Sequence, residues 1–320
     1  MRGVKAEYSE TIEGFDEANP RHLRRVSLSD TSIEMEVMIH RGRKSSLRPL
    51  LIINSVEFPI PPSTEFCEKM WAAGYQVIFC RRPGFGGVAG LPDVLLTKEH
   101  VKDGAAIATE AALFALLMET LELKDVILLG LGTSNSICYR LGQLSSNVSF
   151  TVFANPLTHP SIWDVIRPDW LKRMIRQTLL SKGGLKIAVR GLKAVLRRDT
   201  HWFYRQFAQK SAGDVAYVTK HKADFEDAGQ ALQWISPKTF YYDLQMSLIE
   251  DTEWDPNVTS QINAALLAGV ETTEQFKTAI KNEAGRLGLP IVFAQSGDLF
   301  VPYASPDELL RLLNEHVGGT

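Results

Sequence analysis

The feature that most constrains the fold is a repeated alternation of short apolar runs with amphipathic segments of helical spacing. The apolar runs are LLIINS (50–55), YQVIFC (75–80), KDVILLG (124–130) and VSFTVFAN (148–155). The helical segments between them are 63–74, 99–121 and 136–144. Strands that alternate with helices at this spacing predict right-handed crossovers and an α/β fold with a parallel sheet. Two earlier segments, 24–30 and 32–40, alternate apolar and polar residues and predict antiparallel strands.

The alternation stops after residue 156 and resumes only at LPIVFAQ (289–295). The residues between are rich in helical periodicity and poor in strand signals, which predicts a helical insertion. We therefore expect a loose N-terminal extension (1–20), a core of two segments (21–156 and 286–320) and a helical cap (157–285).

Composition excludes several classes of protein. The chain carries 35 Lys and Arg against 37 Asp and Glu, a net charge of −2, so we expect no nucleic-acid partner. Its three cysteines show no C-x-x-C spacing, which argues against a disulfide framework and a zinc site. The first residues lack an apolar signal-peptide core, and no apolar run has the length of a membrane span. We expect a cytoplasmic protein with no metal site.

Three loop motifs resemble those of the α/β-hydrolase superfamily. They are RRPGFGG (81–87), KDVILLGLGTS (124–134) and PIVFAQSGDLFVP (290–302). The resemblance implies a mostly parallel sheet flanked by helices, with a helical cap inserted after the sixth strand. It also implies a Ser-His-Asp triad on the loops at the carboxyl ends of the strands.

The turn after the fifth strand departs from the family pattern at the nucleophile. Counting from the strand puts Gly130 at the first glycine, Gly132 at the nucleophile position and Thr133 next to it. The following helix, which contains YRLG (139–142), gives the same register. Glycine has no side chain and cannot attack a carbonyl, so this register predicts an impaired enzyme. A register shifted by two residues would instead make Ser134 the nucleophile, and Ser134 also suits a helix N-cap.

The oxyanion loop departs from the family as well. Asn54 and Ser55 replace the His-Gly pair, although the backbone N–H groups of Ser55 and Val56 could still point inward. Glu57 is unusual there, because a carboxylate would oppose an oxyanion.

The resemblance places the triad acid at Asp298, after strand 290–295. In the family the histidine follows a further helix and a last strand, and too few residues remain here for both. We therefore expect a truncated C-terminus, a sheet that ends at 290–295, and a terminal helix over 306–316 that carries His316 at its end. His159, after the sixth strand, is the other histidine that we place near the site.

These assignments predict a pocket between core and cap that is lined by Asn54, Phe58, Phe85, Gly132 and Asp298. The outer flank of strand 290–295 would be covered by a second copy, making a homodimer, or by residues 1–20. Residues 164–205 contain eleven Lys or Arg and three Asp. This basic segment suits either a solvated cap helix or peripheral contact with an anionic membrane or an acidic ligand.

Three hypotheses follow. The first is a degenerate α/β-hydrolase-like protein that binds a small apolar or acyl ligand, or a partner, without turnover. The second is an active serine ester hydrolase that uses Ser134 with Asp298. The third is a hydrolase shortened at its C-terminus. No cofactor is implied, because the chain has neither a G-x-G-x-x-G turn after its first strand nor a Walker motif.

Overall fold

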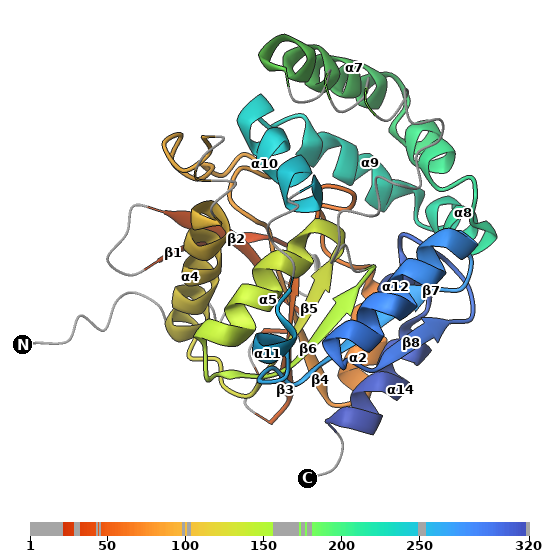
Figure 1. Ribbon diagram of the computed structural model, residues 1–320. Helices are drawn as coiled ribbons and strands as arrows, with labels where there is room; N and C mark the ends of the chain where they lie inside the picture. Colours follow the sequence, from red (N-terminus) through yellow and green to blue (C-terminus); the bar gives the residue numbers. More distant parts are fainter. Residues whose placement is uncertain are drawn as a thin grey trace, which may run out of the picture.

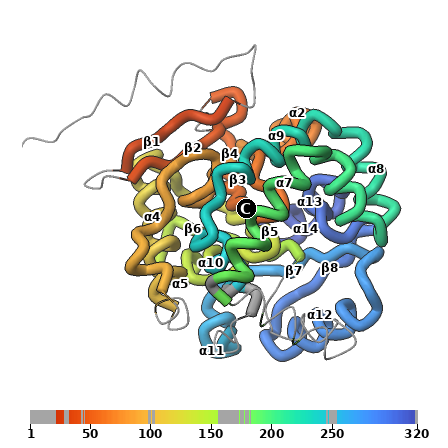
Figure 2. The backbone as a smooth tube through the Cα atoms, turned by 90° about the horizontal axis from the view of Figure 1, so that it is seen from above, coloured from red at the N-terminus to blue at the C-terminus, as the bar shows by residue number. Residues whose placement is uncertain are grey.

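The computed structural model describes residues 22–28, 33–42, 44, 46–97, 100, 104–155, 173, 177, 181–248 and 254–317. These residues form one eight-stranded sheet with helices on both faces and further helices above one edge (Figures 1 and 2). The predicted N-terminal extension (1–20) lies outside the described residues.

The sheet has the strand order β1-β2-β4-β3-β5-β6-β7-β8. Its strands are β1 (Arg24–Ser27), β2 (Glu34–Ile39), β3 (Arg48–Ile53), β4 (Tyr75–Cys80), β5 (Val126–Leu131), β6 (Val148–Ala154), β7 (Ala264–Gly269) and β8 (Ile291–Ala294). β2 pairs with β1 and with β4 in antiparallel orientation, whereas the six strands β3 to β8 are parallel to one another. The carboxyl ends of the parallel strands therefore meet at one edge, as the apolar runs predict.

Helices cover both faces because every residue of the central strands β4 and β5 is buried. On one face the core contains side chains of α4 (Ala105–Thr120), α5 (Asn135–Leu144) and α12 (Glu274–Leu287). The short helix α11 (Pro256–Thr259) precedes β7. On the other face it contains side chains of α2 (Thr64–Ala72), α13 (Val301–Ala304) and α14 (Pro306–His316). Ser63 caps α2, since its hydroxyl accepts from the Phe66 N–H at 3.2 Å.

The insertion after β6 contributes a helical cap above the carboxyl edge of the sheet. Its described helices are α7 (Lys182–Phe207), α8 (Ala212–Lys220), α9 (Lys222–Leu232) and α10 (Pro237–Leu248). Figure 1 places them at the top of the molecule, and Figure 2 shows α7, α9 and α10 passing over the strand ends. The prediction of helices inserted after the sixth strand is confirmed.

The boundary predicted for the cap at residue 285 is wrong. β7 and α12 lie inside the range 157–285, yet β7 pairs with both β6 and β8 in the sheet. The run AALLAG was overlooked because alanine and glycine are weak strand formers. Its six residues are all buried, and it is this burial between neighbouring strands and helices that makes the run a strand.

The C-terminal segment follows the sequence pattern closely. β8 is the edge strand of the sheet, and α14 spans the residues predicted for the last helix, 306–316. Leu309, Leu312 and Leu313 are buried, as their helical spacing requires. The covering of the outer flank of β8 by a second copy stays a prediction.

Within the described residues, no helix combines the length and the apolar character needed to cross a bilayer. In the same part of the chain, His, Cys, Asp and Glu side chains form no group of three suited to a metal ion.

Candidate functional site

The turn that leaves β5 is built around two glycines. Gly132 has a φ of +52° and opens a short 3-10 turn (Gly132–Ser134) that leads directly into α5. A side chain at Gly130 would lie 2.6 Å from Asn135 Oδ1 and 2.9 Å from Cys138 Sγ, so the strand can approach α5 only without one. Gly132 thus occupies the sharp bend at the position that the resemblance assigns to the nucleophile.

Ser134 lies inside this turn and is fully buried. Its Oγ donates to Ile53 O at 2.8 Å and accepts from the Leu131 N–H, also at 2.8 Å. The shifted register, in which Ser134 attacks a substrate, therefore disagrees with this geometry. The physical reason is that the hydroxyl joins β3 to the β5 turn and has no exposed surface.

Glu57, from the loop after β3, occupies the space above Gly132. A Cβ on Gly132 would lie 3.2 Å from Glu57 Oε2 and 3.5 Å from both the carboxyl carbon and Oε1. Glu57 Oε2 is buried and has no hydrogen-bond partner. A carboxyl group thus lies in tight contact with the point at which a nucleophilic side chain would start.

The surroundings of Glu57 favour its protonated form. Burial, followed by the negative charge of Asp243, raises the pKa of Glu57 to about 7, although a hydrogen bond from Ser55 opposes the shift. Near neutral pH this group therefore exists in both forms, as a hydrogen-bond donor and as an acceptor.

A second unpartnered polar group lies near Glu57. The Tyr204 side chain, from α7 of the cap, is 1% exposed, and its hydroxyl has no hydrogen-bond partner. Burial, with a smaller contribution from the charge of Glu57, raises the pKa of Tyr204. The hydroxyl is therefore neutral and can donate or accept one hydrogen bond.

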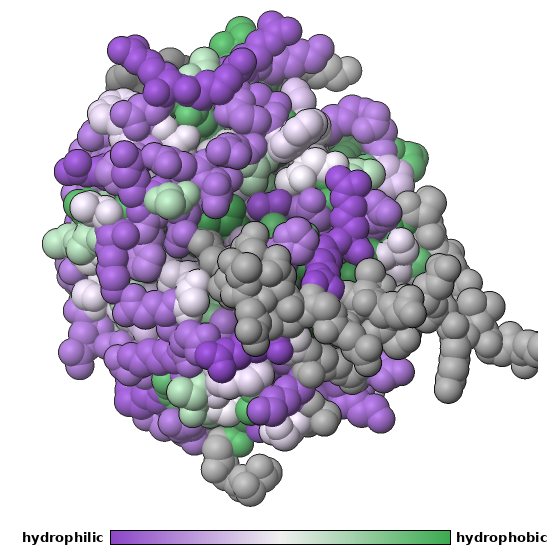
Figure 3. Space-filling view, turned by 180° about the vertical axis from the view of Figure 1, so that it is seen from behind, coloured by the Kyte–Doolittle hydropathy of each residue, from purple (hydrophilic) through white to green (hydrophobic). Residues whose placement is uncertain are grey.

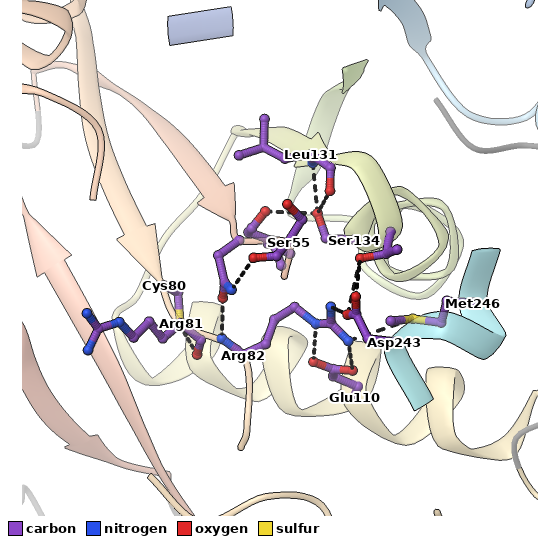
Figure 4. A network of polar contacts seen from close by, with 12 residues as sticks. Ser55, Cys80, Arg81, Arg82, Glu110, Leu131, Ser134, Asp243 and Met246 are labelled. Atoms are coloured by element: carbon purple, nitrogen blue, oxygen red, sulfur yellow. Dashed lines mark hydrogen bonds and ion pairs between the residues drawn. The ribbon is translucent and has the colours of Figure 1, made fainter. Parts of the chain in front are cut away.

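Arg82 and Asp243, whose charges act on Glu57, belong to a buried ionic network (Figure 4). Arg82, from the turn after β4, pairs through Nε with Glu110 of α4 at 2.8 Å and through Nη1 with Asp243 of α10. Thr133 Oγ1 lies 3.1 Å from both carboxylate oxygens of Asp243, to which it donates. The network joins the β4 turn, the β5 turn, a core helix and a cap helix.

Of the residues predicted for the oxyanion loop, Asn54 contacts this network. Asn54 Oδ1 accepts from the Arg82 N–H at 2.6 Å, and Asn54 Nδ2 donates to Ser55 O at 3.0 Å. Val56 is half-buried and packs against the hydrophobic core. Asn54 therefore fixes the β4 turn instead of facing a ligand.

Two of the residues predicted to line a pocket between core and cap belong to aromatic contacts. The ring centroid of Phe58 lies 5.0 Å from that of Phe225 of α9 and 5.6 Å from that of Phe300. The ring of Phe85 lies 5.5 Å from the guanidinium carbon of Arg82 and is fully buried. Phe58 and Phe85 therefore pack into the junction of cap and core, whereas Gly132 and Asp298 are half-buried, and an open crevice at these residues stays a prediction.

Two cavities among the described residues lie elsewhere. One, of about 380 Å³, is lined by residues of α4, α5 and the segment 254–258, and includes Tyr139 and Trp254. Another, of about 470 Å³, lies around Arg48, at the edge of the sheet where β3, β4 and β5 begin.

The strand that precedes Asp298 is the eighth of the sheet, whereas the sequence assignment took it for the seventh. The family pattern behind the assignment of Asp298 to the triad acid counted one strand fewer, so that assignment stays a prediction. Burial raises the pKa of Asp298 to about 6, and a hydrogen bond from Thr272 opposes the shift. The sequence assignment miscounted the strands because β7 was not recognised.

The remaining histidine candidates do not complete a triad among the described residues. His159 lies outside them. The ring of His316 stacks on Phe150, with centroids 5.5 Å apart, at the end of α14. The sequence reasoning also missed the role of Arg82, although it lies in the RRPGFGG motif, and the roles of Glu110 and Asp243, for which no local motif gives a signal.

Comparisons with known proteins agree with the fold. Neither a protein family nor a curated protein matches the sequence. Among solved structures, the chain is similar to a bromoperoxidase from Bacillus anthracis at 16% identity and a TM-score of 0.57, over 93% of this chain and 100% of that one. It is similar to the enol-lactonase from Burkholderia xenovorans LB400 at 13% identity and a TM-score of 0.56, over 92% and 100%.

A third similar structure is MGS-M2, an α/β hydrolase enzyme from a deep-sea metagenome library. The identity is 14% and the TM-score 0.57, over 92% of this chain and 98% of that one. The chain thus has the α/β-hydrolase fold, as the three loop motifs predict.

Proposed function

We propose that this chain is an α/β-hydrolase-fold protein without serine hydrolase activity, and that it binds a small apolar or acyl ligand between core and cap. The observation that carries the proposal is the pairing of Gly132 with the carboxyl group of Glu57 at the nucleophile position. A serine enzyme needs a hydroxyl there and a histidine beside it. This chain has glycine at the first position and Asp298 after the last strand.

The ligand class follows from the unpartnered groups. Leaving a buried donor or acceptor without a partner costs about 1–3 kcal/mol, so Glu57 Oε2 and the Tyr204 hydroxyl favour a molecule that satisfies both. A carbonyl oxygen accepts from protonated Glu57 and from Tyr204. The apolar remainder would replace contacts among the rings of Phe58 and Phe225, so entry requires movement of the cap.

We also propose that the protein is located in a reducing, cytoplasmic compartment. All three cysteines are free and buried, which suits such a compartment.

The loss of hydrolysis is tested with p-nitrophenyl butyrate and a fluorophosphonate probe. We expect neither turnover nor labelling of the wild-type protein, and the same result for Ser134→Ala. Gly132→Ser alone is expected to stay inactive, because its Cβ would lie 3.2 Å from Glu57 Oε2. Turnover by the wild-type protein that Ser134→Ala abolishes would contradict the proposal.

Ligand binding is tested separately with methyl butyrate, a neutral ester, by calorimetry across pH. We expect binding that weakens as pH rises through about 7, because ionised Glu57 can no longer donate to the carbonyl. Glu57→Gln keeps a donor and should bind without this pH dependence, whereas Tyr204→Phe should bind more weakly. Absence of binding at every pH would overturn the ligand part and leave the loss of hydrolysis standing.

A further inference from the structure

The cap helix α7 carries an unusual concentration of positive charge. Its residues include seven Lys or Arg (182, 186, 190, 193, 197, 198 and 205), and Asp199 is its only acid. The chain as a whole has a net charge of −2, so α7 is a strongly basic element on a weakly acidic protein.

The side chains of α7 separate into three rows. Leu185, Val189 and Leu196 are buried against the rest of the cap and core. Lys186, Arg190, Lys193 and Arg197 recur every three or four residues and form a row of cations, which we call the cationic row. All of them are exposed except Lys193, which is half-buried.

The third row is apolar and faces solvent. Ile187 is 71% exposed, Val195 is 37% exposed, and the exposed Gly191 and Ala194 lie between them on the same face. Packing within the described part of the chain does not explain why an isoleucine is so exposed on a helix that already has a buried apolar face. We call this row the apolar row. Trp202, which is 53% exposed, follows a kink at Asp199, where the backbone of α7 is not helical.

The surroundings of α7 extend the same character. Gln233 Nε2 donates to Lys193 O at 3.3 Å, which places the end of α9 beside the cationic row. The next residue, Trp234, is 69% exposed. The Trp234 ring lies beside Gly87 of the turn after β4, so Trp202 is the exposed tryptophan of α7 itself, and tryptophan favours the boundary between water and lipid.

The position of α7 leaves its outer face available for a large partner. In Figures 1 and 2 the helix runs over the top of the molecule, across the carboxyl edge of the sheet. Seen from behind in Figure 3, strongly hydrophilic groups with hydrophobic ones between them follow the upper rim of the molecule. Among the residues that the structure describes, a broad surface can therefore approach α7 without meeting the core.

We propose that the outer face of α7 docks on a membrane surface that contains anionic lipid. The cationic row would pair with headgroup phosphates, and the apolar row would enter the boundary between headgroups and acyl chains. Long Lys and Arg side chains can reach the headgroups while the helix lies flat in this boundary. The charge of the row matches an anionic bilayer, and its exposed apolar side chains match no property of a free anion or a nucleic acid.

The test uses the full chain and vesicles of phosphatidylcholine with or without phosphatidylglycerol, with bound protein measured by co-sedimentation. We expect binding only to the vesicles that contain phosphatidylglycerol. Raising the ionic strength to about 1 M, where the Debye length is only about 3 Å, should greatly weaken the binding.

Two sets of variants separate charge from apolar insertion. Neutralising the exposed cationic row (Lys186→Gln, Arg190→Gln and Arg197→Gln together) should lower the vesicle partition coefficient on the order of 100-fold. The matched control removes three exposed cations elsewhere, Lys222→Gln, Lys281→Gln and Arg311→Gln, and should leave binding unchanged. Replacing Ile187 and Val195 by serine should lower the coefficient roughly tenfold. Circular dichroism verifies that each variant is folded.

Three outcomes would overturn the proposal. They are the absence of binding to vesicles with phosphatidylglycerol, an equal loss of binding in the control variant, and full binding by the Ile187 and Val195 variant. If the full chain bound duplex DNA but not vesicles, the cationic row would be assigned to a nucleic acid instead. None of these results depends on whether the protein binds an acyl ligand.

Discussion

At the scale of single residues, Gly132 and Glu57 form a matched pair. Gly132 tolerates its positive φ and leaves room above the turn, and the carboxyl of Glu57 takes that room. A serine at position 132 would bring back a side chain at 3.2 Å from Glu57 Oε2, so either residue constrains the other.

The raised pKa of Glu57 makes stability depend on pH. The pKa is about 7 in the folded protein against an ordinary value of 4.5, so the folded state holds the proton more tightly. Stability should then fall as pH rises from about 4.5 to about 7 and level off above. Glu57→Gln removes this dependence, so it should gain stability relative to wild type as pH rises. Urea denaturation at pH 5 and pH 8 measures the difference. Parallel curves for the two proteins would contradict the assignment of the titration to Glu57.

At the scale of elements, the Arg82 network fastens the cap to the core. Its carboxylates come from α4 and α10, and Thr133 adds the β5 turn. Burial by itself lowers the pKa of Arg82, but Glu110 and Asp243 more than compensate and raise it above its ordinary value. The arginine therefore stays charged although it is almost completely buried.

Breaking this network on one side should be costly. Arg82→Met leaves Glu110 and Asp243 buried without a cation, and we expect a loss of about 3–5 kcal/mol in the free energy of unfolding. The triple variant Arg82→Met, Glu110→Leu and Asp243→Leu removes all three charges and should recover most of this loss. Thermal and urea unfolding measure both variants. A loss below about 1 kcal/mol for the single variant, the size typical of surface pairs, would show that the network is hydrated.

At the scale of the whole molecule, an aromatic cluster joins the cap to the core at the carboxyl edge of the sheet. Phe225 of α9 contacts Phe58, Tyr204 and Phe300, with ring centroids 4.7–5.1 Å apart. The cluster joins the loop after β3, two cap helices and the loop after β8. Asp214 of α8 adds a polar link, since its carboxylate accepts from the backbone N–H groups of Asp298 and Leu299.

Shortening the central ring of this cluster should loosen the cap before the sheet. Phe225→Ala should cost about 3–5 kcal/mol, and hydrogen exchange should speed up in α7, α8 and α9 more than in β5. Phe114→Ala is the matched control, because Phe114 is equally buried on the opposite face of the sheet. The control should lower global stability without preferential exchange in the cap. Equal exchange profiles for the two variants would show that core and cap unfold as one unit.

The sequence by itself determined the layered α/β fold, the parallel strands up to β6, the helical insertion and the last helix. Those features depend on local periodicity and on apolar runs, which are visible within about ten residues. The tertiary structure alone decided that AALLAG is a strand, since its neighbours β6 and β8 bury it. It also brought Glu57 onto Gly132, 75 positions later in the chain, and Arg82 onto Asp243, 161 positions later. Such pairs leave no periodic trace, because each depends on where whole elements end in space.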